Sequence, residues 1–151
     1  MTAVILSIVS AGCSYLSMET VKNIPVIDHK IYNVIFEDKP TVTTKEVYAG
    51  TTEIGKVLDE TAASGNLTVI KISVQNEHDD FMKSNVVFYV SDGRLELDTV
   101  GDTGEPLSEG AKILGFAGKT GLYWFKTKSA VKSVSGAAAN KAEELYNRAF
   151  K

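Results

Sequence analysis

Short segments with strand-like patterns of apolar and polar residues fill the middle of the chain. In IYNVIFE (31–37), alternation puts Tyr32, Val34 and Phe36 on one face, which predicts a strand with that face turned toward a core. Similar segments follow, separated by turn-forming residues: VYAGTTEIGKVLDE (47–60), LTVIKISV (67–74), VVFYV (86–90), RLELDTV (94–100) and KILGF (112–116). Six or seven short strands between residues 31 and 116 predict an all-β domain, either a small barrel or a sandwich.

The hydrophobic period changes near the C-terminus, from that of a strand to that of a helix. After Ser129, apolar residues recur at spacings of three and four, which places them on one helical stripe: Val131, Val134, Ala138, Ala142, Leu145 and Ala149. The stripe is narrow and rich in alanine, so an isolated helix of this kind is only marginally stable. We therefore expect a C-terminal amphipathic helix that packs against the barrel or against copies of itself.

The chain opens with an apolar run, MTAVILSIVSAGCSYLS, that ends at its only cysteine, Cys13. The run is too short to cross a bilayer, which takes about 20 apolar residues. It is either a shortened signal peptide with a lipoprotein cleavage site at Cys13, or a buried N-terminal strand or helix with an incidental cysteine. Residues 14–30 show no sustained period and are interpreted as a connector between residues 1–13 and the β domain at 31–116.

Composition and charge limit the possible functions. The 151 residues are enough for one domain with one core. A net charge of −3 and scattered basic residues argue against a nucleic-acid-binding protein, which normally has a concentrated basic face. A single cysteine excludes an internal disulfide.

The sequence contains no recognisable catalytic constellation. His29 and His78 are far apart in sequence, and no zinc-protease, redox-dithiol, nucleophile-elbow or phosphate-loop motif is present. The acidic residues Glu77, Asp79 and Asp80 beside His78 could bind a cation through oxygen ligands, or they form a solvated turn, as a loop or one helical turn between two strands. We expect a non-enzymatic protein with no metal and no cofactor.

One aromatic cluster, GLYWFK, follows the last expected strand and belongs to the C-terminal segment 117–151. Tyr123, Trp124 and Phe125 either plug the core where this segment crosses the barrel, or they contact a partner, a lipid or a membrane interface. Both interpretations remain open from the sequence.

The segment VYAGTTEIGKV (47–57) resembles the V-x-Y-x-G-V-x-V-G-x-V signature of the mammalian cell entry (MCE) domain family. Gly50 and Gly55 occupy the glycine positions of that motif, whereas Thr51 and Thr52 stand where valine is more common. Physically, Gly50 suits a turn with positive φ, and Gly55 suits a close approach of two backbones in a curved strand. The resemblance extends more weakly over residues 31–116.

This resemblance implies a fold, a small seven-stranded MCE-type β-barrel, and an assembly, a homohexameric ring. The family consists of substrate-binding subunits of bacterial lipid transport systems, which pass lipid through a central pore. The pore loop would be SDGRLELDTVG (91–101), with Leu95 and Leu97 of each copy forming an apolar collar. The alternative is that both leucines fill the core of their own barrel.

The resemblance also implies a location and partners. Members of the family are tethered to a membrane of the cell envelope on its periplasmic face, and Ser10-Ala11-Gly12-Cys13 resembles a lipobox in which Cys13 is the lipid anchor. The expected partners are a phospholipid or another lipid, a membrane ATPase and permease, and further copies of the chain. The alternative function is that of a structural or protein-binding envelope lipoprotein built on a small β-barrel.

Overall fold

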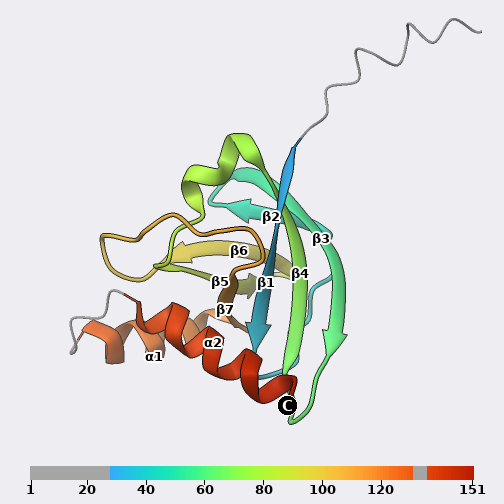
Figure 1. Cartoon of the computed structure of the whole chain (residues 1–151), viewed down its shortest axis with the longest axis vertical. Helices are drawn as coiled ribbons and strands as arrows, with labels where there is room; N and C mark the ends of the chain where they lie inside the picture. The colour runs from blue at the N-terminus through green and yellow to red at the C-terminus, as the bar shows by residue number, and fades with distance from the viewer. Residues whose placement is uncertain (1–27, 131–135) are drawn as a thin grey trace, which may run out of the picture.

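Seven strands form one closed barrel, and two helices follow them (Figure 1). The computed structural model describes residues 28–130 and 136–151. The elements are β1 (His29–Phe36), β2 (Glu46–Ala49), β3 (Thr52–Ala62), β4 (Thr68–Gln75), the 3-10 helix η2 (Asn76–Phe81), β5 (Val86–Ser91), β6 (Arg94–Thr99), β7 (Lys112–Phe116), α1 (Lys119–Ala130) and α2 (Ala137–Ala149). The all-β fold class, the seven-stranded barrel and the C-terminal helix are thus confirmed.

Around the barrel the strands follow the order β1-β4-β3-β2-β6-β5-β7. Hairpins join β2 to β3, β3 to β4 and β5 to β6 in antiparallel pairs, whereas β1 with β7, β5 with β7, and β2 with β6 are parallel. The two-residue turn Asp92-Gly93 joins β5 to β6, and both residues have positive φ. Such a turn matches the twist of the two strands.

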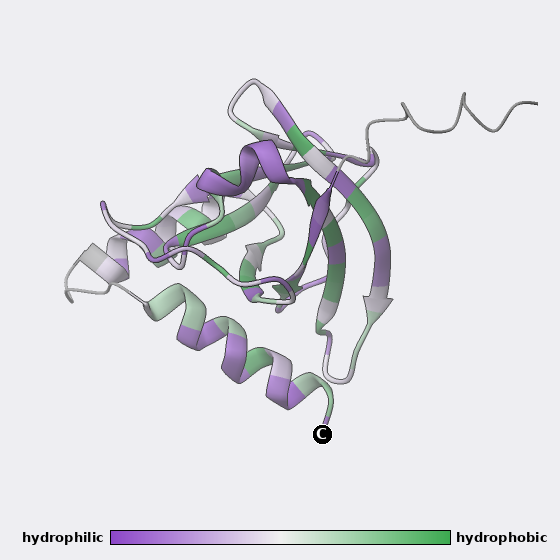
Figure 2. Ribbon diagram, turned by 45° about the horizontal axis from the view of Figure 1, so that its top comes forward, coloured by the Kyte–Doolittle hydropathy of each residue, from purple (hydrophilic) through white to green (hydrophobic). Residues whose placement is uncertain are grey.

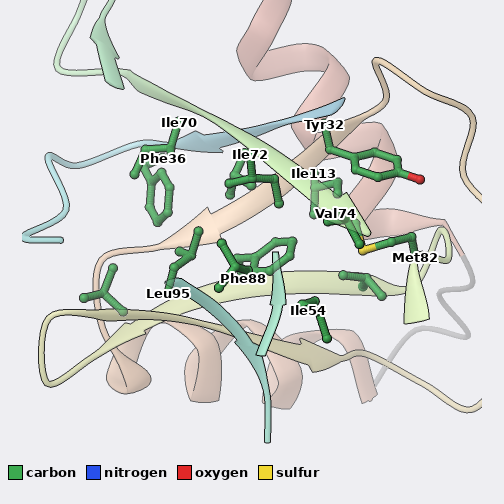
Figure 3. Close-up of a cluster of buried hydrophobic side chains, with 14 residues drawn as sticks. Tyr32, Phe36, Ile54, Ile70, Ile72, Val74, Met82, Phe88, Leu95 and Ile113 are labelled. Atoms are coloured by element: carbon green, nitrogen blue, oxygen red, sulfur yellow. The ribbon is translucent and has the colours of Figure 1, made fainter. Parts of the chain in front are cut away.

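Side chains fill the interior of the barrel. Tyr32, Val34 and Phe36 are completely buried there, which confirms the face predicted for β1. Figure 3 shows Tyr32 and Phe36 among side chains from the other strands. The largest buried members of this cluster are Tyr32, Phe36, Ile54, Ile70, Ile72, Met82, Phe88, Leu95 and Ile113. Burial of these apolar side chains is the main source of the barrel's stability.

A second core lies on the outside of the barrel, under the helices. Ile35, Val87 and Leu114 point outward from their strands and pack with Ala142 and Leu145 of α2. This second core explains why β5 has a continuous apolar run, since both of its faces are covered. In Figure 1 both helices lie below the barrel, and Figure 2 shows α2 with alternating hydrophilic and hydrophobic patches along its length.

The C-terminal helical stripe is confirmed where the structure describes it. Ala138, Ala142, Leu145 and Ala149 are the buried residues of α2, and this face packs on β7 and β1. Of the two interpretations, packing against the barrel is therefore the one observed. Val131 and Val134 lie outside the described residues.

The two glycines of the β2–β3 hairpin have the geometries expected from the sequence. Gly50 has φ of +62°, a conformation that L side chains rarely adopt. Gly55 has no such φ, but a Cβ placed on it would overlap the carbonyl oxygen of Ser73 on β4. Gly50 thus permits the turn, and Gly55 permits β3 and β4 to approach closely.

The predicted leader and connector lie largely outside the described residues, and so does Cys13, the expected lipid anchor. Within the described parts of the chain, no helix has the length and apolar character needed to cross a bilayer.

Candidate functional site

A groove with a volume of about 760 Å³ lies between α1, α2 and the end of β7. Pockets that hold one small ligand commonly have volumes of about 300–1,000 Å³. The groove is lined by Glu37, Asp38, Leu114, Gly115, Phe116, Ala117, Gly118, Thr120, Gly121, Trp124, Phe125, Lys128, Ala137, Asn140, Lys141 and Glu144.

Small residues where β7 passes into α1 leave the space for this groove. Gly115 lines the groove with its backbone alone, because a Cβ there would point into the barrel, within 2.6 Å of the Phe36 ring. Gly121 lies directly against Phe116, to whose ring a Cβ would approach within 3.3 Å. Together with Ala117 and Gly118, these residues give the groove a floor that has small side chains and no polar side-chain atoms.

Aromatic rings form the wall on the α1 side. The rings of Phe116 and Phe125 are 5.3 Å apart between centroids, tilted by 48°, a favourable arrangement for an aromatic pair. Trp124 stands beside them at the rim, and 60% of it is exposed to solvent. A ligand in the groove would therefore contact π faces and aliphatic carbon.

Charged residues of both signs border the α2 side of the groove. Lys141 contacts Glu37 at 3.5 Å and Glu144 at 3.4 Å, and Arg148 contacts Glu37 at 3.8 Å. The two contacts with Glu37 link α2 to the chain just after β1. Each is an exposed ion pair worth little by itself, but together they mark a polar border around an apolar floor.

Polar contacts join α1 to the outer face of the β5–β6 hairpin. Lys126 binds Asp98 at 2.7 Å, and the Lys119 ammonium lies 5.8 Å from the centre of the Tyr89 ring. Partial burial and a hydrogen bond to the Glu96 carboxylate raise the pKa of Tyr89 to about 12. Together with buried Leu122, these contacts hold the wall of the groove in place.

The structure corrects the expected pore loop. Residues 94–99 form strand β6, and Leu95 is 0% exposed, inside the barrel between Val47 of β2 and Val90 of β5 (Figure 3). Leu97 is partly buried and packs against the same core. The two-residue turn keeps β6 in the barrel wall, so the leucines occupy the alternative position, the core of their own barrel.

The acidic cluster near His78 lies on η2 and is tied to β1. Asp79 accepts hydrogen bonds from the Lys30 ammonium and, at 2.9 Å, from the Tyr32 hydroxyl. Lys30 lowers the pKa of Asp79, with a smaller contribution from Tyr32, against the effect of partial burial; the pKa of Tyr32 is raised, mainly by burial. In the described ranges, no group of three His, Cys, Asp or Glu side chains is arranged to hold a metal ion.

Of the residues singled out in the sequence, the structure brings Trp124 and Phe125 into the groove, and leaves Tyr123 on the outer face of α1. Leu114, Phe116 and Gly121 were not anticipated as site residues. The sequence gives only a weak indication of these residues. The segment KILGF predicts a buried strand, but the contact of the end of this strand with two helices becomes visible only in the structure.

No protein-family model matches this sequence, and no curated protein matches it.

Proposed function

We propose that this protein is a non-enzymatic lipid-binding subunit of a bacterial cell-envelope lipid transport system of the MCE kind. Two features support the proposal: the glycine motif around Gly50 and Gly55, and a small seven-stranded barrel of the class that the motif implies. The observation that carries it is the apolar, aromatic-walled groove between α1, α2 and β7.

In this proposal the lipid binds outside the barrel. The barrel interior is occupied by large buried side chains such as Tyr32, Phe36 and Phe88. The groove, in contrast, offers Phe116, Trp124 and Phe125 to an acyl chain. Each methylene removed from water there would contribute about 0.8 kcal/mol.

The wider assembly belongs to the same proposal. A membrane anchor at Cys13 would hold the domain on the periplasmic face of the envelope, next to a membrane ATPase and permease. A ring of identical subunits, hexameric in the family that the motif resembles, would bring several grooves together. Leu95 and Leu97 have no part in this arrangement, since they pack within the barrel.

Trp124 provides a direct test, because it is the only tryptophan of the chain and lines the groove. A lysophospholipid with a brominated acyl chain, kept monomeric, should quench Trp124 fluorescence saturably. Asn140→Phe, which fills the groove from α2, should weaken this quenching at least tenfold. Asn147→Phe makes the same change at an exposed position of α2 outside the groove lining and should bind like the wild type.

Two results would count against the proposal. One is the absence of saturable quenching in the wild-type protein, which would favour the alternative of a structural or protein-binding lipoprotein. The other is equal quenching in both phenylalanine variants, which would place the lipid elsewhere on the surface.

A further inference from the structure

The outward face of α1 is unusual for a surface helix. Such a helix normally turns one apolar stripe to the core and polar residues to solvent. Helix α1 buries Leu122 against the barrel, yet its solvent-exposed surface presents two aromatic rings, Tyr123 at 69% and Trp124 at 60% exposure. Two adjacent exposed aromatic side chains on one helix indicate a surface that meets another apolar phase.

Lysines frame this aromatic pair. Residues four apart lie on the same side of a helix, so Lys119 lies one turn before Tyr123, and Lys128 lies one turn after Trp124. Helix α1 carries three lysines and no acidic residue, in a chain whose net charge is −3. Lys126 is paired with Asp98 and the Lys119 ammonium lies over the Tyr89 ring, so Lys128 supplies the positive charge beside the aromatic pair.

We propose that this face of α1 docks on the surface of an anionic lipid bilayer. Tyrosine and tryptophan favour the interface between headgroups and acyl chains, because their rings are apolar while their O–H and N–H groups remain hydrogen-bonded. Lysines extend aliphatic stems along the apolar layer and place their ammonium groups among lipid phosphates. The complementary charge selects a bilayer rich in anionic lipid as the occupant.

Docking through α1 goes beyond the proposed lipid-binding function and does not depend on it. The two are connected in space, because Trp124 belongs both to the exposed face and to the rim of the groove. A docked α1 would bring the groove's mouth to the bilayer surface, where a lipid could enter without crossing water.

Vesicle flotation tests this inference. The full-length chain with Cys13→Ser, which prevents acylation of that residue, is mixed with vesicles of phosphatidylcholine alone or with phosphatidylglycerol added. We expect binding only to the vesicles containing phosphatidylglycerol, and weaker binding as the salt concentration rises. Trp124 emission should shift to the blue, and lipids brominated near the headgroup should quench it more than lipids brominated at the chain end.

Matched variants locate the docking face. Lys128→Gln should weaken binding roughly fivefold, the effect of about 1 kcal/mol per lysine near an anionic surface, and Tyr123→Ser should weaken it at least as much. Lys45→Gln and Leu58→Ser make the same kinds of change beside β2 and on β3, on the side of the barrel away from the helices, and should not alter binding. Matching melting curves would verify that all four variants are folded.

Several outcomes would overturn the inference: no flotation with anionic vesicles, equal binding to phosphatidylcholine alone, or equal losses in the α1 variants and the controls. Self-association that Tyr123→Ser abolishes, without vesicle binding, would assign the face to a second copy instead. Asn140→Phe, which blocks the groove and leaves the outer face of α1 unchanged, should still float with anionic vesicles. Loss of groove binding and loss of docking are therefore distinguishable.

Discussion

At the scale of single residues, the β2–β3 hairpin contains two glycines that are required for different reasons. Gly50 has the space for a side chain but an unfavourable φ, whereas Gly55 has an ordinary φ but no space, because the backbone of β4 lies against it. The motif thus combines a conformational requirement at Gly50 with a packing requirement at Gly55. Adding a methyl group should therefore destabilise the fold by a different amount at each position.

Alanine substitutions should separate these two requirements. Gly50→Ala should reduce the free energy of unfolding by about 1–2 kcal/mol, the cost of a left-handed conformation. Gly55→Ala should reduce it by about 3 kcal/mol or more, since β3 and β4 must separate to admit the methyl group. Urea denaturation measures both; equal effects, or a wild-type midpoint for Gly55→Ala, would show that the two strands are not in such close contact.

The Lys30–Asp79–Tyr32 contact should make stability depend on pH in acid. Because the pKa of Asp79 is lower in the folded than in the unfolded protein, its contribution is fully present above the unfolded value and is lost as the pH falls through the folded value. We expect the free energy of unfolding to decrease below about pH 4, and this decrease to be smaller in Asp79→Asn. Asp80→Asn, at an exposed neighbouring position, should keep the wild-type acid dependence; an unchanged dependence in Asp79→Asn would contradict the contact.

At the scale of elements, the strands and α2 were predictable from the sequence, whereas α1 was not. The strands have period-two or continuous apolar patterns bounded by turn residues, and α2 has one apolar stripe. In α1, apolar residues lie on both sides, with Leu122 inside and Trp124 outside, and Gly121 interrupts the segment. Such a pattern has no clear helical period, because some apolar residues of α1 face the barrel and others face the groove or solvent.

Helix α2 contributes to stability chiefly through its buried stripe. Leu145 is 0% exposed and lies in the second core, so Leu145→Ala should reduce the free energy of unfolding by about 2–5 kcal/mol. The control Leu58→Ala, at an exposed position of β3, should change it by less than about 0.5 kcal/mol. Thermal or urea denaturation would decide; a Leu145→Ala effect as small as the control would mean that α2 is not packed on the barrel.

At the scale of the whole molecule, one barrel supports two cores and a groove. The inner core closes the barrel, and the outer core attaches the helices to β7 and β1. The sequence indicated Trp124 and Phe125 as candidate contacts, but the groove also needs Phe116 and Gly121, which become neighbours only when α1 folds back beside β7. The expected collar of Leu95 and Leu97 is not observed for a related reason. Alternation of apolar and polar residues in a strand does not distinguish side chains inside a barrel from side chains that line a pore.

Photocrosslinking tests whether lipid binds in the external groove. The protein is irradiated with a phospholipid whose acyl chain carries a diazirine, and the labelled peptides are identified by mass spectrometry. Labels are expected on groove residues such as Phe116, Trp124 and Asn140, and these labels should be lost in Asn140→Phe but not in Asn147→Phe. Labels concentrated on Leu95 and Leu97, or no specific label at all, would contradict lipid binding in the groove.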